Sequence, residues 1–161
     1  MALGKRTPAQ LPASLFLLSL VAAAAALLEV VGAYLPPVTS DQMFTRVVLS
    51  VGLPLGFAWA VLLLAHQRQR FVQTGIALLG VGVLAELFLY PIGSLIHVIG
   101  SDHLEAVPFG VLMLIGLIWY LLACANIWRA ALNSGMALGI AVSVGYLVLS
   151  ILFEQMLLPD K

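Results

Sequence analysis

The sequence predicts an all-α fold, a polytopic membrane bundle of five transmembrane helices. Of its 161 residues, 63% are hydrophobic and only 9% are charged, whereas a typical soluble domain has about 25% charged residues. Five apolar stretches each come close to the ~20 residues that a helix needs to cross the hydrocarbon core of a bilayer. Seven basic residues balance seven acidic ones, so no net charge attracts the chain to nucleic acid. The composition therefore excludes a soluble globular domain, a disordered tail and a nucleic-acid-binding protein.

The five spans are expected at about residues 12–35, 47–65, 71–90, 107–128 and 135–158. The second and the fourth contain no acidic, basic or histidine residue. The first contains Glu29, the third contains Glu86, and the last has no such residue before Glu154. The connections between the spans are too short to fold separately. We therefore expect a single integral membrane domain that covers residues 1–161.

The apolar stretch that begins at Phe71 is too long for one simple span. It continues to Ile99, so an uninterrupted helix would have 29 residues and would measure about 43 Å at 1.5 Å per residue. Pro91 and Gly93 stand where a break would be expected, because proline lacks an N–H and clashes with the preceding turn. We expect this third helix to be broken near Pro91, with its membrane span ending near Tyr90.

Basic residues predict the orientation, because cytoplasmic loops of membrane proteins are enriched in lysine and arginine. With a cytoplasmic N-terminus, Arg46 and Lys161 lie outside. Five basic residues then lie inside: Lys5, Arg6, Arg68, Arg70 and Arg129. This bias predicts a multi-pass protein of a bacterial plasma (inner) membrane, with its N-terminus cytoplasmic and its C-terminus outside. In an alternative interpretation the first apolar stretch is a signal peptide, and its cleavage leaves four spans in the same orientation.

Three glutamates within the spans form the candidate ligand or proton site. Glu29, Glu86 and Glu154 lie four to six residues before the expected outer ends of their spans, or about 6–9 Å along a helix. Charged groups in lipid cost about 2.5 kcal/mol or more, so retained ones usually face an interior or a wet cavity. Clustered carboxyl groups would bind a cation, a proton or a polar ligand. In the alternative interpretation, which the shallow depth favours, each glutamate acts alone and is protonated, hydrogen-bonded or turned toward the outer interface.

Small residues mark the expected contact faces of the helices. Gly75 and Gly82 lie on the glutamate-bearing face of the third helix, and Gly139 lies on that of the fifth. Because small residues let membrane helices approach closely, we expect all three glycines to contact a neighbouring helix. The pattern Gly52-x-x-x-Gly56 in the second span predicts close packing within the chain, or alternatively between two copies of it.

Aromatic residues in the spans are expected to pack rather than to bind. Trp59, Trp119, Tyr120 and Tyr146 lie in mid-span, where packing inside the bundle is the favoured role and stacking on a ligand is the alternative. Trp128 is expected at the inner membrane interface, where amphipathic rings collect.

The sequence contains no motif that indicates an enzyme or a cofactor. A nucleotide-binding loop, a nucleophile elbow and a redox cysteine pair are all absent, and Cys124 is the single cysteine. The polar loop 101–105, with His97 nearby, lacks the spacing typical of a metal site. We therefore predict no catalytic residue, no metal site and no cofactor.

Two segments resemble the Yip (Ypt/Rab-interacting protein) domain membrane family in its short bacterial form. The first is Arg70-Phe-Val-Gln-Thr-Gly-Ile-Ala-Leu-Leu-Gly80, which is similar to the opening of the central helix in such proteins. The second is Gly116-Leu-Ile-Trp119, which is followed by Arg129-Ala-Ala-Leu132 and a final apolar span. The resemblance covers about residues 71–158. It implies a five-span fold, and it supplies no catalytic motif to transfer to this chain.

The sequence thus favours a non-enzymatic assembly or scaffold component of Yip-like type that acts through helix–helix contacts in the lipid bilayer. Its expected partners are other membrane proteins or a second copy of the chain. The alternative is a small transporter or ion-coupled channel that uses Glu29, Glu86 and Glu154. A third hypothesis is a lipid-handling enzyme, which would depend on the polar loop Asp102–Glu105.

Overall fold

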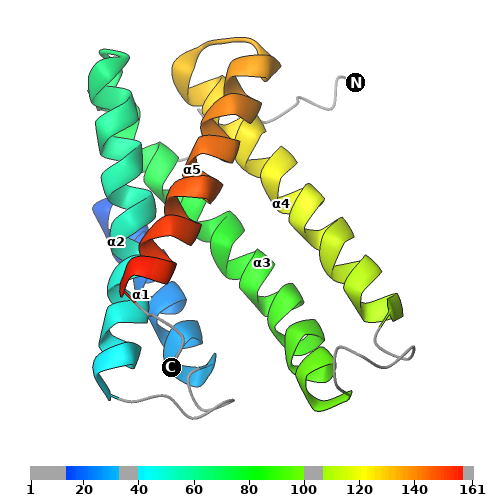
Figure 1. Cartoon of the computed structure of the whole chain (residues 1–161). Coiled ribbons are helices and arrows are strands. Elements are labelled where there is room, and N and C mark those ends of the chain that lie inside the picture. Colours follow the sequence, from blue (N-terminus) through cyan, green and yellow to red (C-terminus); the bar gives the residue numbers. More distant parts are fainter. Residues whose placement is uncertain (1–13, 33–39, 100–106, 158–161) are drawn as a thin grey trace, which may run out of the picture.

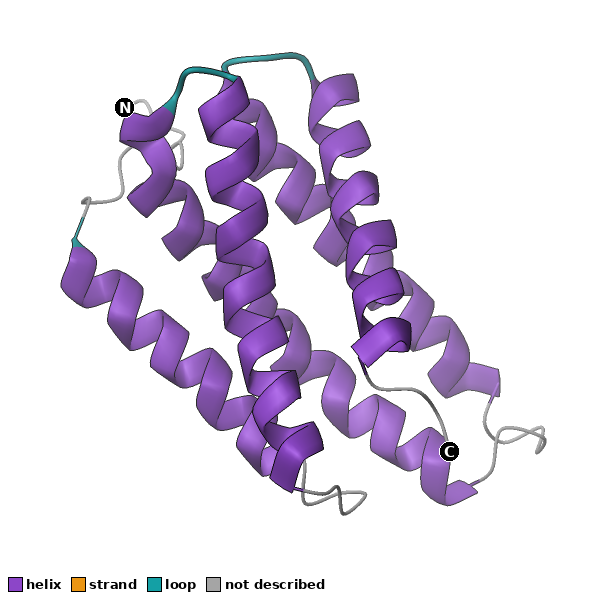
Figure 2. Cartoon of the chain, turned by 60° about the vertical axis from the view of Figure 1, so that its left-hand side comes forward, coloured by secondary structure: helices purple, strands orange, loops and turns teal. Residues whose placement is uncertain are grey.

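The computed structural model describes residues 14–32, 40–99 and 107–157, and these form a bundle of long helices (Figure 1). The helices are α1 (Leu15–Gly32), α2 (Ser40–Leu64), α3 (Phe71–Ile99), α4 (Val107–Leu132) and α5 (Met136–Leu157), and a short 3-10 turn, η2 (Arg68–Arg70), precedes α3. All five helices are long and apolar enough to cross a membrane. The described residues contain no strand (Figure 2). The predicted five-span, all-helical fold is therefore confirmed.

Helical structure follows from the apolar composition of these segments. In a bilayer an unpaired backbone N–H or C=O has no water to bond, so a helix that satisfies its own backbone is strongly favoured. The structure starts α2 at Ser40 and ends α4 at Leu132, each several residues beyond the expected span. Polar residues continue a helix past the hydrocarbon boundary when no helix breaker intervenes. Arg46 consequently lies within α2 rather than in a loop, which matters for the site described below.

The two turns on one side of the bundle use the same helix-ending geometry. After α2, His66 adopts a left-handed conformation with φ of 56°, and the N–H of Gln67 donates to the carbonyl of Leu62 at 2.8 Å. After α4, Asn133 has φ of 51°, and the following N–H makes the equivalent bond at 3.1 Å. This six-residue hydrogen bond ends a helix within one turn, so both connections stay short and hold consecutive helices antiparallel.

The buried core joins α2, α3 and α4 at the end of the bundle near these turns, and Val142 of α5 packs against it. Trp128 is 1% exposed and meets Phe57 edge to face, with ring centroids 5.7 Å apart. The buried core residues around it are Ala58, Leu62, Leu78, Cys124, Ile127 and Ala131. Trp128 therefore faces the interior of the bundle, where its large ring fills space between helices. Its expected depth at the inner membrane interface stays a prediction.

Two of the three predicted contact glycines lie where helices approach closely. A Cβ at Gly139 would overlap the backbone carbonyl oxygen of Ala125, and one at Gly75 would lie 2.9 Å from a Leu55 methyl carbon. The expectation is wrong for Gly82, since no described atom outside its own helix backbone lies within 4 Å of a Cβ there. Gly82 borders a cavity instead. A stripe of small residues identifies a helix face but not what lies opposite it.

Gly52 and Gly56 do not mediate packing between the described helices. The nearest atom to a Cβ at Gly52 is 3.9 Å away, in Val48 of the same helix, and a Cβ at Gly56 meets no described atom within 4 Å. Both glycines are exposed in the single chain, so the expectation of close packing within the chain is wrong for this pair.

The expected break near Pro91 is also wrong, because α3 is one continuous helix from Phe71 to Ile99. Proline lacks the N–H that would bond the carbonyl of Leu87, and membrane helices tolerate such a loss. The Ser94 hydroxyl makes a separate bond in the next turn, to the Pro91 carbonyl at 2.8 Å. Ile92 is 7% exposed, so the helix keeps tertiary contacts beyond the proline. These contacts are invisible in the sequence.

The helices do not pack equally against one another. Helix α3 packs on α1, α2 and α4, whereas α5 packs on α4 and α2. In Figure 1, α3 and α4 run side by side while α5 crosses in front of them. Space is therefore left between α3 and α5, and the candidate site lies there.

Candidate functional site

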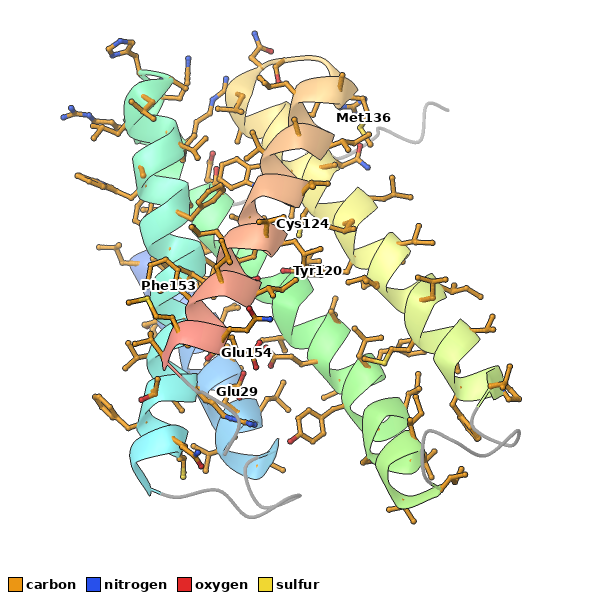
Figure 3. All side chains as sticks on the ribbon, viewed as in Figure 1. Glu29, Tyr120, Cys124, Met136, Phe153 and Glu154 are labelled. Carbon is orange, nitrogen blue, oxygen red and sulfur yellow. The ribbon has the colours of Figure 1, made fainter. Side chains whose placement is uncertain are left out.

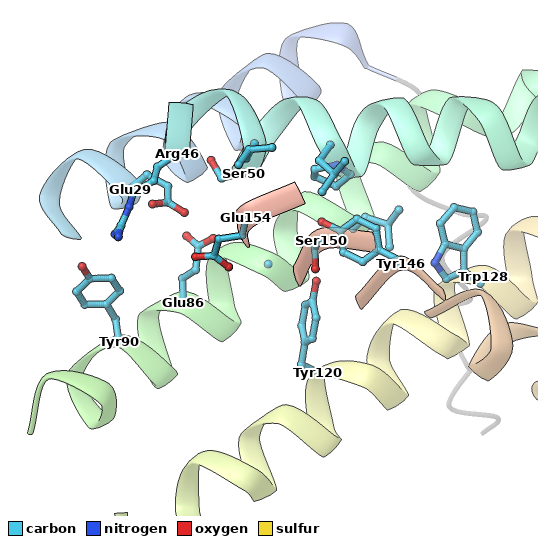
Figure 4. A pocket seen from close by; sticks show the side chains of 15 residues that line it. Glu29, Arg46, Ser50, Glu86, Tyr90, Tyr120, Trp128, Tyr146, Ser150 and Glu154 are labelled. Carbon is cyan, nitrogen blue, oxygen red and sulfur yellow. The ribbon is translucent and has the colours of Figure 1, made fainter. Parts of the chain in front are cut away.

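A cavity of about 310 Å3 lies inside the bundle, and every helix contributes to its wall (Figure 4). Its volume is at the lower end of the range of about 300–1,000 Å3 that is usual for small-molecule pockets. The residues around it are Glu29, Arg46, Leu49, Ser50, Leu53, Pro54, Leu78, Gly82, Glu86, Tyr90, Tyr120, Trp128, Tyr146, Ser150 and Glu154. The wall combines charged and hydroxyl-bearing side chains with aliphatic and aromatic ones.

The polar residues reach the cavity because they repeat every four positions along their helices. Residues four apart lie on one face of an α-helix. The wall is made by three such rows: Arg46, Ser50 and Pro54 on α2; Gly82, Glu86 and Tyr90 on α3; Tyr146, Ser150 and Glu154 on α5. Each row ends in a charged or phenolic side chain at the same end of the cavity. The sequence period therefore positions the polar groups, and the packing of the helices makes the rows converge.

The three glutamates predicted as a shared site all border this cavity. Glu29 extends from α1, Glu86 from α3 and Glu154 from α5, and their side chains gather in one region of the bundle (Figures 3 and 4). Glu29 and Glu86 are partly buried, whereas Glu154 is exposed. Glu29 interacts electrostatically with both of the others. The structure thus brings together residues that lie more than a hundred positions apart in the chain.

Arg46 belongs to the same group, and sequence reasoning missed it. It lies in the second turn of α2, and it interacts electrostatically with Glu29. Within the described part of the chain, the Nε of Arg46 and the Oε2 of Glu86 are buried without a hydrogen-bond partner. Buried polar atoms are rarely left unpaired in native structures. The two atoms therefore have capacity for a water, an ion or a ligand.

A signal for Arg46 was present in the sequence. It precedes Ser50 and Pro54 by four and eight positions, so a helix that begins at least one residue before the predicted span would align it with them. The predicted span began at residue 47, one position too late. The error lay in the helix boundary, because hydropathy detects the hydrocarbon core rather than the end of a helix.

The phenol groups form the second polar component of the cavity. Tyr90 donates its hydroxyl to the backbone carbonyl of Gly32 at the end of α1. Tyr146 packs against Phe57 with ring centroids 5.4 Å apart, and its row places it on the wall together with Tyr120. These two tyrosines therefore pack in the bundle, as predicted, and also border a cavity, which the sequence did not reveal.

Two tryptophans predicted to pack inside the bundle lie on its outside. Trp59 is 55% exposed and Trp119 is 49% exposed. In a membrane protein an outward-facing indole meets lipid, which is as apolar as the bundle interior. Hydrophobicity alone therefore cannot assign such residues to the inside.

The structure does not separate the three glutamates, since all of them border one cavity. Helix α3 continues past Pro91, so its apolar span ends ten residues beyond Glu86, at Ile96. Glu154 lies three residues before Leu157, where α5 ends. The expected end of the third span at Tyr90 therefore does not measure the depth of Glu86, and the shared cavity argues against treating it as an isolated interfacial group.

The remaining sequence candidates lie outside the described residues or form no site within them. The loop 101–105 and the side chain of His97 are not described. Among the described residues, no group of three or more histidine, cysteine or acidic side chains is placed to hold a metal ion. Cys124 is a free, buried cysteine.

Comparison with known proteins gives no relative. No protein-family model, curated protein or solved structure matches the chain. The resemblance to the Yip family therefore stays a prediction based on the two segments quoted above.

The arrangement offers three carboxyl groups, one guanidinium and three phenols around a volume suited to a small ligand. If Arg46 offsets one carboxylate, an excess of negative charge remains for a cation. Carboxyl groups also accept and release protons, so cation binding and proton release can compete for the same oxygen atoms. The cavity therefore has the chemistry for exchange of a proton against a cation.

Proposed function

We propose that the protein is a small transporter that exchanges protons for a cation at Glu29, Glu86 and Glu154. The observation that carries the proposal is the convergence of these three carboxyl groups and Arg46 on one cavity within the membrane-spanning helices. Each charged group inside a bilayer costs about 2.5–3.5 kcal/mol or more. Helix packing alone does not require four ionisable groups around one cavity. Their presence is explained if the cavity binds a cation or a proton.

If the protein is a scaffold, its functional surface lies on the outside of the bundle rather than at the cavity. A scaffold needs lipid-facing helix surfaces for partners and has no need of the acidic cavity. It predicts that the combined changes Glu29→Gln, Glu86→Gln and Glu154→Gln leave function intact. The transport proposal predicts that Glu86→Gln alone abolishes it, because this carboxyl group borders the cavity and its Oε2 is buried without a hydrogen-bond partner among the described residues.

The test uses purified protein in liposomes with an acidic interior that contains a pH-sensitive dye. Tetramethylammonium, a small organic cation without an alkyl chain, is added outside. We expect it to accelerate proton efflux several-fold over protein-free liposomes. Glu86→Gln and the cavity-filling change Gly82→Leu should abolish the acceleration. The matched control is Arg68→Gln, which removes an exposed charge in the short turn before α3 and should behave as the wild type does.

If tetramethylammonium leaves the proton efflux unchanged in the wild type, or if Glu86→Gln retains the full effect, the cavity is not a cation–proton exchange site.

We also propose a location and orientation for the transporter. The location is a bacterial inner membrane, as the resemblance to the short bacterial Yip form implies, and the basic residues support an N-terminus inside and a C-terminus outside. In this orientation the charged ends of the three polar rows lie toward the outer side of the membrane.

A further inference from the structure

A second hollow adjoins the acidic cavity and differs from it in chemistry. It has a volume of about 940 Å3 and lies between α3, α4 and the end of α5. Its own wall is mainly aliphatic and includes Leu89, Val98, Met113, Leu117 and Leu147. We call it the apolar groove. Val98 is 82% exposed and Met113 is 43% exposed, so the groove opens toward the surface that a lipid bilayer would cover.

The cavity and the apolar groove share part of their walls. Gly82, Glu86, Tyr90, Tyr120 and Glu154 border both of them. A single ligand can therefore occupy both spaces, with one end among the carboxyl groups and the other among aliphatic side chains. The polar row on α3 marks the boundary between the two.

We propose that the ligand of this site is an amphiphile with a cationic head and a single alkyl chain, which enters from the bilayer. The head lies among Glu29, Glu86 and Glu154, and the chain lies in the apolar groove. This inference rests on the proposed exchange function and specifies its substrate class. Charge complementarity argues for a cationic head, since the cavity presents three carboxyl groups and one guanidinium.

The dimensions of the groove suit one chain. Its wall follows α3 from Gly82 to Val98, or about 24 Å along the helix axis. One leaflet of a bilayer contributes about 15 Å of hydrocarbon, so a chain of ordinary lipid length fits within the groove. Because lipid is as apolar as the groove, the chain adds little selectivity, and the charge of the head decides which amphiphile binds.

The test is photo-crosslinking in nanodiscs of neutral phosphatidylcholine. The probe is dodecyltrimethylammonium with a diazirine in the terminal half of its chain. The matched probe has the same chain and diazirine but a sulfate head. We expect the cationic probe to label residues of the groove, such as Met113 and Leu117, at least about tenfold more than the sulfate probe does, a ratio equal to about 1.4 kcal/mol.

Two glycines provide matched variants. Gly93 borders the groove but not the cavity, and no described atom lies within 4 Å of a Cβ there. Gly93→Leu should therefore fill the groove and reduce labelling there. Gly145 on α5 has equally open space around it and borders neither hollow, so Gly145→Leu should retain the labelling. Glu86→Gln should remove the preference for the cationic head.

The outcomes separate this inference from the proposed function. Equal labelling of the groove by both probes, or labelling spread evenly over the outer helix surfaces, overturns the amphiphile site. If tetramethylammonium still drives proton efflux in that case, the exchange function stands and only the substrate class is wrong. If Glu86→Gln changes neither the efflux nor the labelling, both proposals fail.

Discussion

At the scale of single residues, the same amino acid has different roles according to what lies opposite it. Gly139 and Gly82 both lie on glutamate-bearing faces of their helices. Gly139 is buried against the backbone of α4, whereas Gly82 borders the cavity. A Cβ is therefore excluded sterically at one position and accepted at the other. Stability measurements distinguish the two environments directly.

We predict that Gly139→Ala destabilises the protein and Gly82→Ala does not. The new Cβ at residue 139 meets a carbonyl oxygen of Ala125 that belongs to the rigid backbone of α4. Overpacking of this kind costs about 1–3 kcal/mol, which exceeds the gain of about 1 kcal/mol from replacing a helical glycine by alanine. Unfolding by sodium dodecyl sulfate in mixed micelles measures both variants. Equal stability of the two would contradict the close approach of α4 and α5.

At the scale of elements, Arg70 connects the start of α3 to the end of α4. Its Nη1 donates to the carbonyl oxygens of Ala130 and Ala131 at 2.7 Å and 3.1 Å. These carbonyls belong to the last turn of α4, which has no further residue to bond them. The positive charge of Arg70 also interacts favourably with the negative, C-terminal end of the α4 helix dipole. Arg70 thus holds the start of α3 against the end of α4, although the bonded residues are sixty positions apart in the chain.

We expect Arg70→Gln to lower the free energy of unfolding by about 1.5 kcal/mol, the low end of the range for hydrogen bonds to charged groups, because the side chain is only partly buried. Hydrogen exchange of the amides near the end of α4 should become faster at the same time. Arg68→Gln is the control, since this exposed side chain should change stability by less than about 0.5 kcal/mol. If both variants lose the same free energy of unfolding, the net charge of the turn stabilises the protein, and the hydrogen bonds from Arg70 to α4 do not.

The elements also show what a sequence can and cannot predict here. Hydropathy predicted five spans because the bilayer imposes the same requirement on every crossing helix. The break expected from Pro91 did not occur, and hydropathy placed the start of α2 too late, since the continuity and the ends of a helix depend on local hydrogen bonds and neighbouring helices. The glutamate faces of α3 and α5 followed from helical periodicity. The cavity between them did not, because it depends on how far apart the helices lie.

At the scale of the whole molecule, the convergence of the polar rows defines an asymmetric bundle. A buried apolar core joins α2, α3 and α4 at the end near His66 and Asn133, with α5 packed against it. The acidic cavity and the apolar groove lie toward the other end. The positions of the basic residues predict which end faces the cytoplasm. The orientation therefore decides from which side water and cations reach the carboxyl groups.

We predict that a reporter enzyme fused after Lys161 lies on the outer side of the membrane. Five basic residues inside against two outside favour this orientation. Paired fusions with alkaline phosphatase, which is active outside, and a fluorescent protein, which is fluorescent inside, measure it. A fluorescent fusion without phosphatase activity would contradict the orientation, and the cavity would then open toward the cytoplasm.

The central claim is that the acidic cavity is accessible to water and attracts cations. Its most direct test is the reaction rate of Gly82→Cys with methanethiosulfonate reagents that carry either a trimethylammonium or a sulfonate group. The native Cys124 is buried, so the wild type should react slowly. Gly145→Cys, on an open face outside the cavity, is the lipid-facing control. We predict that Gly82→Cys reacts at least about tenfold faster with the cationic reagent than with the anionic one. This preference should disappear when Glu86→Gln is added. Reaction of Gly82→Cys that is no faster than that of Gly145→Cys, or that is equal for the two reagents, would contradict the account.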